Sequence, residues 1–598
     1  MRVIVQPVGK PGDQTFLSEA CRALNILQTV WRFELMPAVT RTDPGLDAPE
    51  CFSPDVAFTS IPESPVKKLG DCYLTIGTFR GRVDTDGMLS LYKREEEKVV
   101  VSNFSWPAQN LPIPIWMTAL SNVALRHYSG IDCSDDLCLG YKSISIGELD
   151  SFLSKLTICG DCRSRFEAIE PYRVDEIDGL VQWLANHWHS GFDLESLVKL
   201  SPPELRVFSR QIRRQLLKER SQLFAPYRMV LILHHLPDLA PFINGLMDLG
   251  AKQENIALLV KPYPYGEKSQ VGGFISYHYP KVQIDYLSSL PPSDSHMARV
   301  LGSAEGCKLI IIEDGGYLVP YLHKNVANYK TICLGAVEQT TKGLRNDKEL
   351  DDLRIPVVDV AKSKFKDEHE APLVGKSIVY NILRILEPKG LHYPGRTAGV
   401  IGYGAIGRHV ASEIRKTLNM IVQVADVDRT SLLQAKNDSF EAFDRVEDAI
   451  RGAFLVVGTT GGTKKGNKVC PTVSKRELGF LSNGAILVSA SSDQIEFDIQ
   501  ELEAIASRKN RIRGVGTEYF VERSSRVDSC LLVGDGYPIN FFRGSGIPNQ
   551  SIDPILTQLL LGAVLIASEK LPPGINQFPD QLIEDNGVID DFLDVHRG

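Results

Sequence analysis

The chain has 598 residues, of which 43% are hydrophobic and 23% are charged. These fractions are those of an ordinary globular protein and exclude a disordered tail or a disulfide-stapled miniprotein. At roughly 100–200 residues per domain, the length predicts three to five domains. The formal net charge is −8. The chain is acidic overall and has no long basic run, so its charge does not favour a nucleic acid or an anionic membrane as the main partner.

The eleven cysteines are an odd number, and most of them lie far apart in the sequence. Such a set suits a reducing compartment better than a disulfide framework. The first ten residues show no charged region followed by an apolar run, so we expect no signal peptide. The apolar stretch at 555–567 is too short to span a bilayer. We therefore expect a cytoplasmic protein without a membrane partner.

Residues 1–172 are predicted to form an α+β domain, with short β-type runs such as MRVIVQPV, DCYLTIGTF and EKVVVSNFSW. Near its end, four cysteines follow the spacing C-x4-C-x20-C-x2-C: Cys133, Cys138, Cys159 and Cys162. A C-x2-C knuckle facing a second close pair is the tetrahedral thiolate arrangement that Zn²⁺ prefers. Four thiolates leave no open position, so the pattern predicts a structural zinc. Four buried reduced cysteines are the alternative.

The segment at about 95–170 also resembles the end of archaemetzincin-type metallopeptidases, in which a metal-binding helix leads into a cysteine and a later C-x2-C. The resemblance places that family's three zinc-binding histidines on Asn122, Arg126 and Asp132, and its catalytic glutamate on Val123. These residues are not a plausible catalytic set. The resemblance thus implies a pseudo-peptidase region that keeps a zinc knuckle. His127, the nearby histidine, is expected on a helix surface.

A charged helical pattern follows at 173–225, and we predict that it connects two domains. Its second half carries a group of basic side chains: Arg210, Arg213, Arg214, Lys218 and Arg220. These side chains could form a basic patch. The nearby Glu204 and Glu219 favour an ordinary solvated helix face instead.

From residue 226 onward, short runs of Val, Ile and Leu alternate with helical patterns. The runs are MVLILHHL, NIALLVKPY, VQIDYL, KLIIIEDGG, TICLGAV and IPVVDV. Continuous apolar runs suit strands that are covered on both faces, and hence a parallel sheet. We predict an α/β domain at 226–375.

The clearest motif is a glycine loop that follows the apolar run TAGVI and precedes a helical pattern. In such a loop Gly402 allows the tight turn, Gly404 lets the backbone approach a pyrophosphate, and Gly407 allows close helix–strand packing. The helix then begins at Ala405 and Ile406 and offers free N–H groups to the phosphates. The motif predicts a doubly wound Rossmann domain, which we place at 376–520. A Rossmann-like domain without a nucleotide is the alternative.

Two further features fit a nucleotide. Asp426 ends the next strand pattern, roughly 20 residues after the loop, where an acidic side chain accepts hydrogen bonds from a ribose 2′-OH. This favours NAD over NADP, although Arg429 lies nearby. The run FLVVGTTGG predicts a strand that ends in a small-residue loop at the carboxyl edge of the sheet, where nucleotides bind. An ordinary tight turn is the alternative for this loop, which contains Thr459, Thr460 and Gly461.

Residues from about 229 to 568 resemble the S-adenosylhomocysteine hydrolase family. The matching segments, in family order, are VLILHHL, LIIIEDGGYL, GAVEQTTKG, VAKSKF, GYGAIGR, DVDRTSLLQA, VVGTTGG, LLVGDGYPIN and GSGIP. The resemblance implies a split α/β substrate domain, to which residues 521–598 return, beside the NAD-binding domain. It also implies a tightly bound NAD that oxidises the adenosyl ribose, so that homocysteine is eliminated and water added.

The resemblance assigns roles to particular residues. The catalytic histidine, aspartate and lysine fall on His234, Asp314 and Lys362, with His235 as the second choice for the histidine. The residues near the nicotinamide are Thr340, Thr341 and Asn540.

Several substrate-facing positions depart from the family pattern. The catalytic glutamate becomes Gln339, and the basic, tyrosine-bearing tail is replaced by DNGVIDDFLDVHRG. Losing one group from a set that acts as a unit typically costs orders of magnitude in rate, so we do not expect authentic adenosylhomocysteine hydrolysis. The other replaced positions are Lys342 for a threonine, Lys366 and Asp367 for an Asp-Asn pair, and Ser492 and Ile547 for two histidines.

Two hypotheses follow. The first is a catalytically divergent, NAD-dependent enzyme that acts on a nucleoside-like small molecule. The second is a non-catalytic sensor or interaction protein that binds NAD or an adenosine-type ligand and carries a pseudo-peptidase N-terminal domain. A general 2-hydroxyacid dehydrogenase is disfavoured, because EDGG and EQTTKG lie outside the Rossmann half. A homo-oligomer is possible, although the altered tail leaves its arrangement open.

Overall fold

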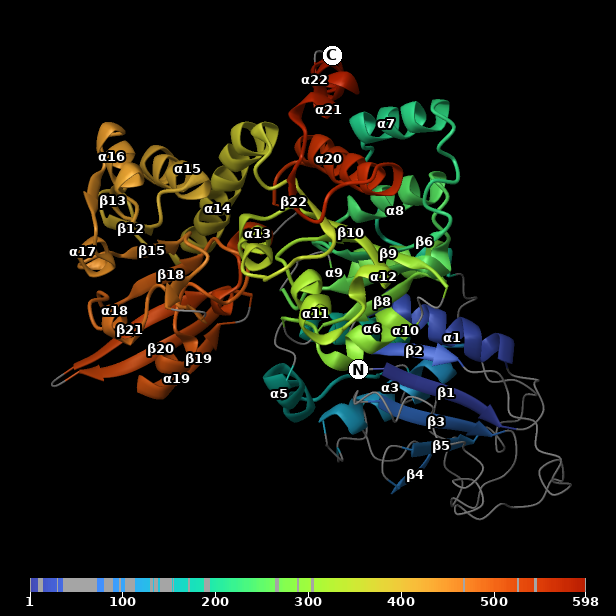
Figure 1. Ribbon diagram of the computed structural model, residues 1–598. Coiled ribbons are helices and arrows are strands. Elements are labelled where there is room, and N and C mark those ends of the chain that lie inside the picture. Colours follow the sequence, from blue (N-terminus) through green and yellow to red (C-terminus); the bar gives the residue numbers. More distant parts are fainter. Residues whose placement is uncertain are drawn as a thin grey trace, which may run out of the picture. The chain divides into compact units, whose positions relative to one another are not determined.

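The computed structural model describes residues 2–8, 14–28, 31–35, 73–79, 90–95, 98–102, 113–129, 133, 138–139, 153, 155–169, 173–187, 194–263, 268–287, 290–302, 306–465, 468–512, 514–523, 526–542 and 546–596. The chain divides into two compact units (Figure 1). Unit 1 comprises Met1–Ser201 and Lys268–Lys281, and unit 2 comprises Pro202–Glu267 and Val282–Gly598.

Unit 1 contains a five-stranded sheet in the order β2-β1-β3-β5-β4, in which β4 is antiparallel to β5 and the other pairs are parallel. Three of these strands confirm the β-type runs of the sequence. The strands are β1 (Arg2–Val8), β2 (Arg32–Leu35), β3 (Tyr73–Phe79), β4 (Ser90–Glu95) and β5 (Lys98–Ser102). The helices are α1 (Gln14–Leu27), α3 (Ile113–Ser129), α5 (Gly160–Ile169), α6 (Val174–His187), η5 (Glu195–Leu197) and α9 (Lys268–His278).

Two parts of unit 1 differ from the predicted boundaries. Helix α6 belongs to the apolar core of this unit, so residues 173–225 are not a single connector. Helix α9, which we predicted within the 226–375 domain, packs against α1. The close approach has a physical reason, because a Cβ at Gly273 would lie only 2.5 Å from the carbonyl oxygen of Ile26. Arg32 also donates a hydrogen bond of 2.9 Å to Ser276.

The first sheet of unit 2 has seven parallel strands in the order β22-β11-β10-β9-β6-β7-β8. The six apolar runs all form strands, which confirms the predicted parallel sheet. The strand order reverses between β6 and β9, and ligands of open α/β sheets bind at such a switch point. The strands are β6 (Tyr227–Ile232), β7 (Ile256–Val260), β8 (Gln283–Tyr286), β9 (Lys308–Glu313), β10 (Cys333–Glu338), β11 (Pro356–Asp359) and β22 (Gly574–Gln577).

The helices around this sheet come from both ends of unit 2. Six of them follow strands or short turns of the sheet: η6 (Gln253–Asn255), α8 (Leu239–Asp248), α10 (Asp294–Gly302), α11 (Leu318–Asn325), α12 (Tyr329–Ile332) and α13 (Thr341–Lys348). Helix α20 (Asn549–Ser568) is long and apolar enough to cross a membrane by length and composition alone. However, 78% of its apolar window is buried, and it packs on β9, β10 and β11, as expected for a core helix.

The second sheet of unit 2 has the order β14-β13-β12-β15-β18-β21-β20-β19. Its first six strands are parallel and follow the 3-2-1-4-5-6 order of a dinucleotide-binding sheet. The predicted boundary at residue 520 falls inside β20, because the sheet continues as an antiparallel extension. The strands are β12 (Thr397–Ile401), β13 (Ile421–Ala425), β14 (Glu441–Phe443), β15 (Leu455–Gly458), β18 (Ala485–Ser489), β19 (Ala506–Ile512), β20 (Gly516–Arg523) and β21 (Arg526–Val533).

Helices and short turns complete this half of unit 2. The helices are α14 (Ala371–Leu386), α15 (Ala405–Glu413), α16 (Arg429–Asn437), α17 (Val446–Ile450), α18 (Lys475–Leu478) and α19 (Ile499–Ile505). The short elements are η7 (Lys366–Glu370), η8 (Glu387–Lys389), η9 (Ile414–Leu418), η10 (Gly534–Gly536), η11 (Ile539–Phe541), β16 (Thr463–Lys465) and β17 (Lys468–Cys470).

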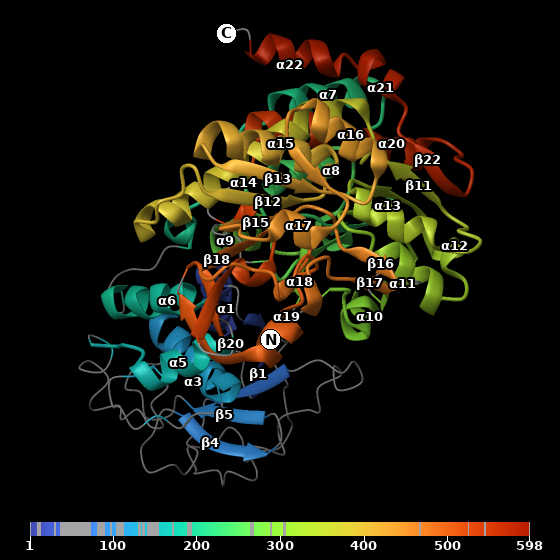
Figure 2. The same cartoon turned by 90° about the vertical axis from the view of Figure 1, so that its left-hand side faces the viewer.

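The basic helix α7 (Arg206–Leu217) packs against α20 and against the C-terminal helix α22 (Val588–His596), which follows α21 (Asp580–Asp585) (Figures 1 and 2). Arg210 lies 3.0 Å from Asp591, and Arg214 pairs with the same carboxylate. The two side chains remain 41% and 37% exposed, as the favoured interpretation of a solvated face expects, but they also pair with a buried carboxylate. The acidic end of the chain pairs with them, a contact between segments that no local pattern reveals.

Candidate functional site

The glycine loop joins β12 to α15 with the predicted geometry. Gly402 has a φ of +98°, in the left-handed region that favours glycine. A Cβ at Gly407 would collide with the carbonyl oxygen of Gly402, whereas nothing lies within 4 Å of a Cβ at Gly404. Helix α15 begins at Ala405 and continues through Ile406. The N-terminus of the helix therefore begins beside open space at Gly404, which suits a phosphate site.

Asp426 follows β13 and lies beside this loop. Its Oδ2 accepts a hydrogen bond of 2.6 Å from the backbone N–H of Tyr403, and its Oδ1 accepts one of 2.8 Å from the backbone N–H of Asp428. Tyr403 is anchored in turn, because its hydroxyl donates to Asp438 over 2.8 Å. The backbone thus fixes the carboxylate of Asp426 next to the glycine loop, the position of a ribose-binding acid.

The loop after β15 lies on the other side of the switch point. The Thr459 hydroxyl donates to the carbonyl oxygens of Ile401 and Gly402 over 2.9 Å and 3.0 Å. Thr460 donates to Glu496 over 2.9 Å, and the backbone N–H of Gly461 donates to the same carboxylate over 2.7 Å. Thr459 therefore ties this loop to the glycine loop, whereas Thr460 and Gly461 tie it to Glu496.

One further residue of this half has an unused polar atom. Asn540 lies in η11, and its backbone oxygen accepts a hydrogen bond of 3.0 Å from the Asn381 side chain. The Asn540 side-chain Oδ1 is buried without a hydrogen-bond partner among the described residues. A buried acceptor without a donor is costly, and a carboxamide N–H of a bound nicotinamide would be a suitable donor. The residues present thus fit NAD.

The seven-stranded sheet brings a second group of polar side chains to its switch point. His234 follows β6 and Asp314 follows β9, and His234 Nε2 lies 3.1 Å from Asp314 Oδ2. The same Oδ2 accepts a hydrogen bond of 2.6 Å from the amide of Gln339, which follows β10. Lys261, which follows β7, forms an ion pair with Asp314 Oδ1, and its side chain is completely buried. Sequence reasoning missed Lys261.

Electrostatics sets the charges of this cluster. Burial raises the pKa of Asp314, but Lys261 and His234 outweigh burial and hold that pKa well below its usual range. Burial lowers the pKa of His234, although Asp314 opposes the shift. At neutral pH the cluster therefore contains an ionised Asp314 and a neutral His234, and a neutral imidazole can accept a proton.

The two predicted threonines lie at the start of α13. Thr340 is the N-cap of this helix and accepts a hydrogen bond of 3.0 Å from the backbone N–H of Gly343, while Thr341 is exposed. The Thr340 hydroxyl also donates to Glu338, which accepts hydrogen bonds from the backbone N–H groups of Gly315 and Gly316. Thr340 therefore has a structural role in the loop beside Asp314.

Lys362 lies apart from this cluster. Its side chain is exposed, and its backbone N–H donates to Asp359 over 3.1 Å. In the described chain, the ion pairs of Asp314 join it to His234 and Lys261. Lys366 is less exposed, forms an ion pair of 3.1 Å with Glu370, and contributes to the lowered pKa of His234. The geometry thus groups His234 and Asp314 but does not add Lys362 to them.

Ion pairing also joins the two halves of unit 2. Lys342 of α13 pairs with Asp493, which follows β18. Asp493 Oδ1 also accepts hydrogen bonds from the Tyr263 and Tyr317 hydroxyls over 2.7 Å and 2.6 Å. Burial raises the pKa of Asp493, but Lys342 and the two tyrosines outweigh burial and lower it. Lys342, which stands where the family has a threonine, therefore has a partner in the facing half.

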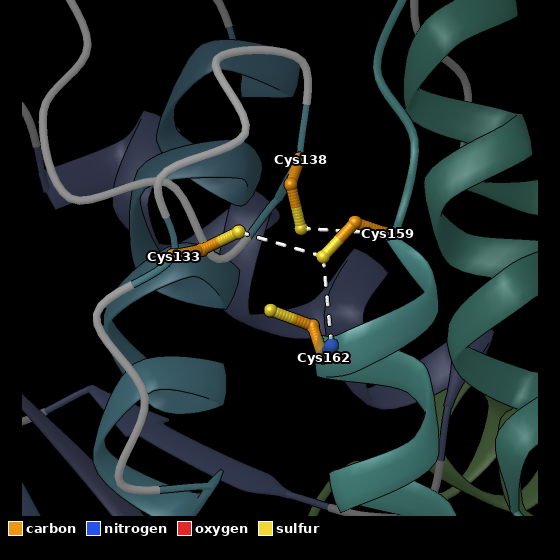
Figure 3. Close-up of side chains that lie close together, drawn as sticks. All are labelled: Cys133, Cys138, Cys159 and Cys162. Carbon is orange, nitrogen blue, oxygen red and sulfur yellow. Dashed lines mark hydrogen bonds between the residues drawn. The ribbon is translucent and has the colours of Figure 1, made fainter.

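The four cysteines of unit 1 lie together, as Figure 3 shows. Their sulfur atoms all lie within 4.8 Å of one another. Cys133 Sγ and Cys159 Sγ are 3.5 Å apart, and Cys138 Sγ accepts a hydrogen bond of 3.3 Å from the backbone N–H of Cys159. The C-x2-C pair lies at the start of α5, so the helix presents Cys159 and Cys162 on one turn. This donor set and spacing fit a tetrahedral metal site.

The positions that the archaemetzincin resemblance assigned to catalysis lie mainly in the interior of α3. Val123 belongs to the apolar core, and Arg126 is buried. Asn122 is also buried and donates to the carbonyl oxygen of Leu139. Asp132 lies outside the described residues, as does the side chain of His127. The resemblance itself stays a prediction.

The second half of the chain matches known proteins. Residues 376–544 match the family described as S-adenosyl-L-homocysteine hydrolase, NAD binding domain. Adenosylhomocysteinases of Thermotoga maritima and Archaeoglobus fulgidus are each 30% identical over 46% of this chain, which is 66% and 65% of their own lengths. An S-inosyl-L-homocysteine hydrolase of Methanocaldococcus jannaschii is 29% identical over 45% of this chain and 63% of its length. The chain thus spans just under two thirds of the length of these relatives.

Among solved structures, a dipicolinate synthase from Bacillus halodurans is 13% identical, with a TM-score of 0.30 over 58% of this chain and 99% of that chain. A likeness at this level supports no conclusion about function.

The strand order, the glycine loop and Asp426 define an NAD-binding protein with a doubly wound sheet. The second half of this chain is similar to the S-adenosylhomocysteine hydrolase family, and residues 376–544 match the NAD-binding domain of that family.

The glycine loop allows the nucleotide site to be separated from the fold. Gly404→Ala fits the open space and the ordinary φ of −76° at this position, so the melting temperature should stay unchanged. The added methyl group should weaken NAD binding about tenfold or more, which corresponds to about 1.4 kcal/mol. Gly407→Ala should instead destabilise the protein by about 1–3 kcal/mol through overpacking. Calorimetric NAD titration and thermal unfolding check both; equal NAD affinity in Gly404→Ala and wild type would contradict the site.

Proposed function

We propose that this chain is an NAD-binding relative of the adenosylhomocysteinases that has lost authentic hydrolysis and acts on a hydroxylated, nucleoside-like ligand. The observation that supports this most is the environment of Asp314. If Asp314 handled protons together with its neighbours, those neighbours would have to give protons to it and take them back. Here Gln339 can only donate through its amide, and Lys261 is a completely buried counter-ion. These partners favour a fixed anion.

The remaining chemistry centres on His234. Asp314 holds the Nε2 of His234, and burial lowers the pKa of His234. The neutral imidazole can therefore act as a general base towards a ligand hydroxyl. When NAD is bound, it supplies the hydride acceptor for oxidation of the carbon that bears the hydroxyl. The glycine loop would hold the pyrophosphate, Asp426 the ribose, and Asn540 the nicotinamide carboxamide. Lys362 is exposed, and we assign it a ligand-facing role at most.

The proposal is tested with S-adenosylhomocysteine and a thiol-trapping reagent that detects homocysteine. We expect no release above background from the wild type, because the acid–base set is incomplete. Gln339→Glu, which restores the carboxylate, is the matched variant, and it should not by itself restore release because Ser492 and Lys366 also depart from the family. Robust release from the wild type that His234→Asn abolishes would refute the loss of hydrolysis.

A non-catalytic sensor of NAD or an adenosine-type ligand is the second candidate. The Lys342–Asp493 pair favours it, because this pair lies between the two halves of unit 2 and can respond to a ligand there. Formation of NADH when nucleosides are added to the NAD-loaded protein would decide for the enzyme. A ligand-dependent shift in melting temperature without NADH formation would decide for the sensor.

We further propose that the four cysteines of unit 1 bind one structural zinc. The convergence of the four sulfur atoms supports this proposal, and four thiolates would leave no coordination position for a substrate. In the same proposal the protein is cytoplasmic, where free thiols persist. We also propose that it forms a homo-oligomer.

A further inference from the structure

Three donors of the seven-stranded half of unit 2 converge on a single carboxylate. Tyr263 follows β7, Tyr317 follows β9, and Lys342 lies in the first turn of α13 after β10. We call these three residues the carboxylate cage. The two tyrosine hydroxyls lie 2.7 Å and 2.6 Å from Asp493 Oδ1, and the Lys342 ammonium pairs with Oδ2. Both oxygens of the Asp493 carboxylate are thus bound.

The cage is built within the seven-stranded half itself. Tyr263 and Tyr317 are buried, and the Lys342 ammonium donates to the Tyr317 hydroxyl over 2.9 Å and lies 4.5 Å from the centre of its ring. These contacts hold Lys342 and Tyr317 together without Asp493, and the ring centre of Tyr263 lies 5.3 Å from the Lys261 ammonium. Because the donors come from one half and the carboxylate from the other, the cage remains available if the two halves separate.

The backbone of Asp493 shows how its carboxylate is placed there. Its φ is +70°, in the left-handed region that non-glycine residues rarely adopt. The side chains of Lys342 and Asp493 are 15% and 20% exposed, so the ion pair lies within reach of solvent. A fully buried ion pair would be closed to a competing carboxylate from solvent, whereas this partly exposed pair is open to one.

We propose that the carboxylate cage is a ligand-binding site for a carboxylate group, and that Asp493 occupies it as an internal stand-in. A ligand carboxylate would replace Asp493 when the halves of unit 2 separate. The cage adjoins His234, whose ring centre lies 5.9 Å from that of Tyr263. A ligand bound there by its carboxylate would present a neighbouring hydroxyl group to His234. The ligand class is therefore a hydroxylated compound that also carries a carboxylate.

This inference rests on the proposed function only for the chemistry at His234, because carboxylate binding itself needs no nucleotide. It is tested on the full chain with lactate as the probe and lactamide as the neutral control. Asp493→Gly removes the internal carboxylate and tolerates the left-handed backbone. Freed from its competitor, the cage should bind lactate about tenfold tighter than in the wild type, measured by isothermal titration, whereas lactamide should bind no better.

The double variant Asp493→Gly/Lys342→Met should lose this gain, because the ammonium of the cage is gone. Asp493→Asn keeps the backbone and serves if the glycine variant does not fold. The proposal would be overturned if Asp493→Gly and the double variant bound lactate equally well. It would also be overturned if lactamide bound as well as lactate, or if neither Asp493→Gly nor Asp493→Asn bound lactate more tightly than the wild type. Nucleotide retention measured on the same proteins distinguishes this failure from a failure of the proposed function.

Discussion

Replacing Lys261 with methionine is expected to lower the free energy of unfolding by about 3–5 kcal/mol at neutral pH. The ammonium of Lys261 is fully buried and pairs with Asp314, whose side chain is only 4% exposed. Methionine fills a similar volume but leaves an ionised carboxylate in a desolvated position, where His234 and Gln339 compensate only in part. Urea-induced unfolding of the wild type and the variant measures the difference.

The matched control is Arg354→Met, which breaks an ion pair whose side chains are 50% and 72% exposed. An exposed pair contributes about 0–1 kcal/mol, so this variant should unfold almost like the wild type. The pH dependence adds a check with a defined sign. The pKa of Asp314 is depressed in the folded protein, so the contribution of the pair is present above the usual carboxyl pKa and fades as pH falls below about 4. Equal effects of the two substitutions would show that Lys261 has no special role.

The second large effect is expected at the cysteine site. Purified without chelators, the wild type should contain about one zinc per chain, and Cys159→Ser should lose most of it. Removing one of four thiolates breaks a closed tetrahedral site, and metal binding contributes directly to folding free energy. Unit 1 should therefore unfold at a lower temperature in the variant. Elemental analysis and thermal unfolding measure the two consequences.

Cys470→Ser provides the control, because Cys470 is a free, partly exposed cysteine outside the cluster. It should keep the zinc content and the unfolding temperature of the wild type. A wild type with well below one zinc per chain, or a Cys159→Ser variant that matches Cys470→Ser, would contradict the metal site.

Local patterns explain why part of the nucleotide site could be predicted from the sequence. Gly402, Gly404 and Gly407 lie within six consecutive residues, and Asp426 directly follows the next strand, so their chemistry is visible in a short stretch. His234 and Asp314 were predicted through the family resemblance, and each lies within two residues of the end of an apolar strand. Lys261 also follows such a strand, in LLVKPY, and this shared position is the signal that could have identified it.

Other contacts could not be predicted, because they join distant segments. The partner of Lys342 is Asp493, 151 positions further along the chain, and neither residue stands out locally. Arg214 and Asp591 meet across 377 positions. Helix α9 lies in the sequence between two strands of the seven-stranded sheet, so it was predicted in the same domain. Its packing on α1 assigns it to unit 1 instead. Strand patterns predict sheets well, but the pairing of polar side chains depends on which strand ends become neighbours.

The nucleotide site in the second half of the chain underlies the proposed function. Mass spectrometry of the small molecules released from the purified, denatured protein tests this site most directly. We expect NAD or NADH in close to stoichiometric amounts from the wild type, and much less from Gly404→Ala, which retains the fold. Release of no nicotinamide nucleotide, together with no measurable binding of added NAD, would contradict NAD binding by this chain.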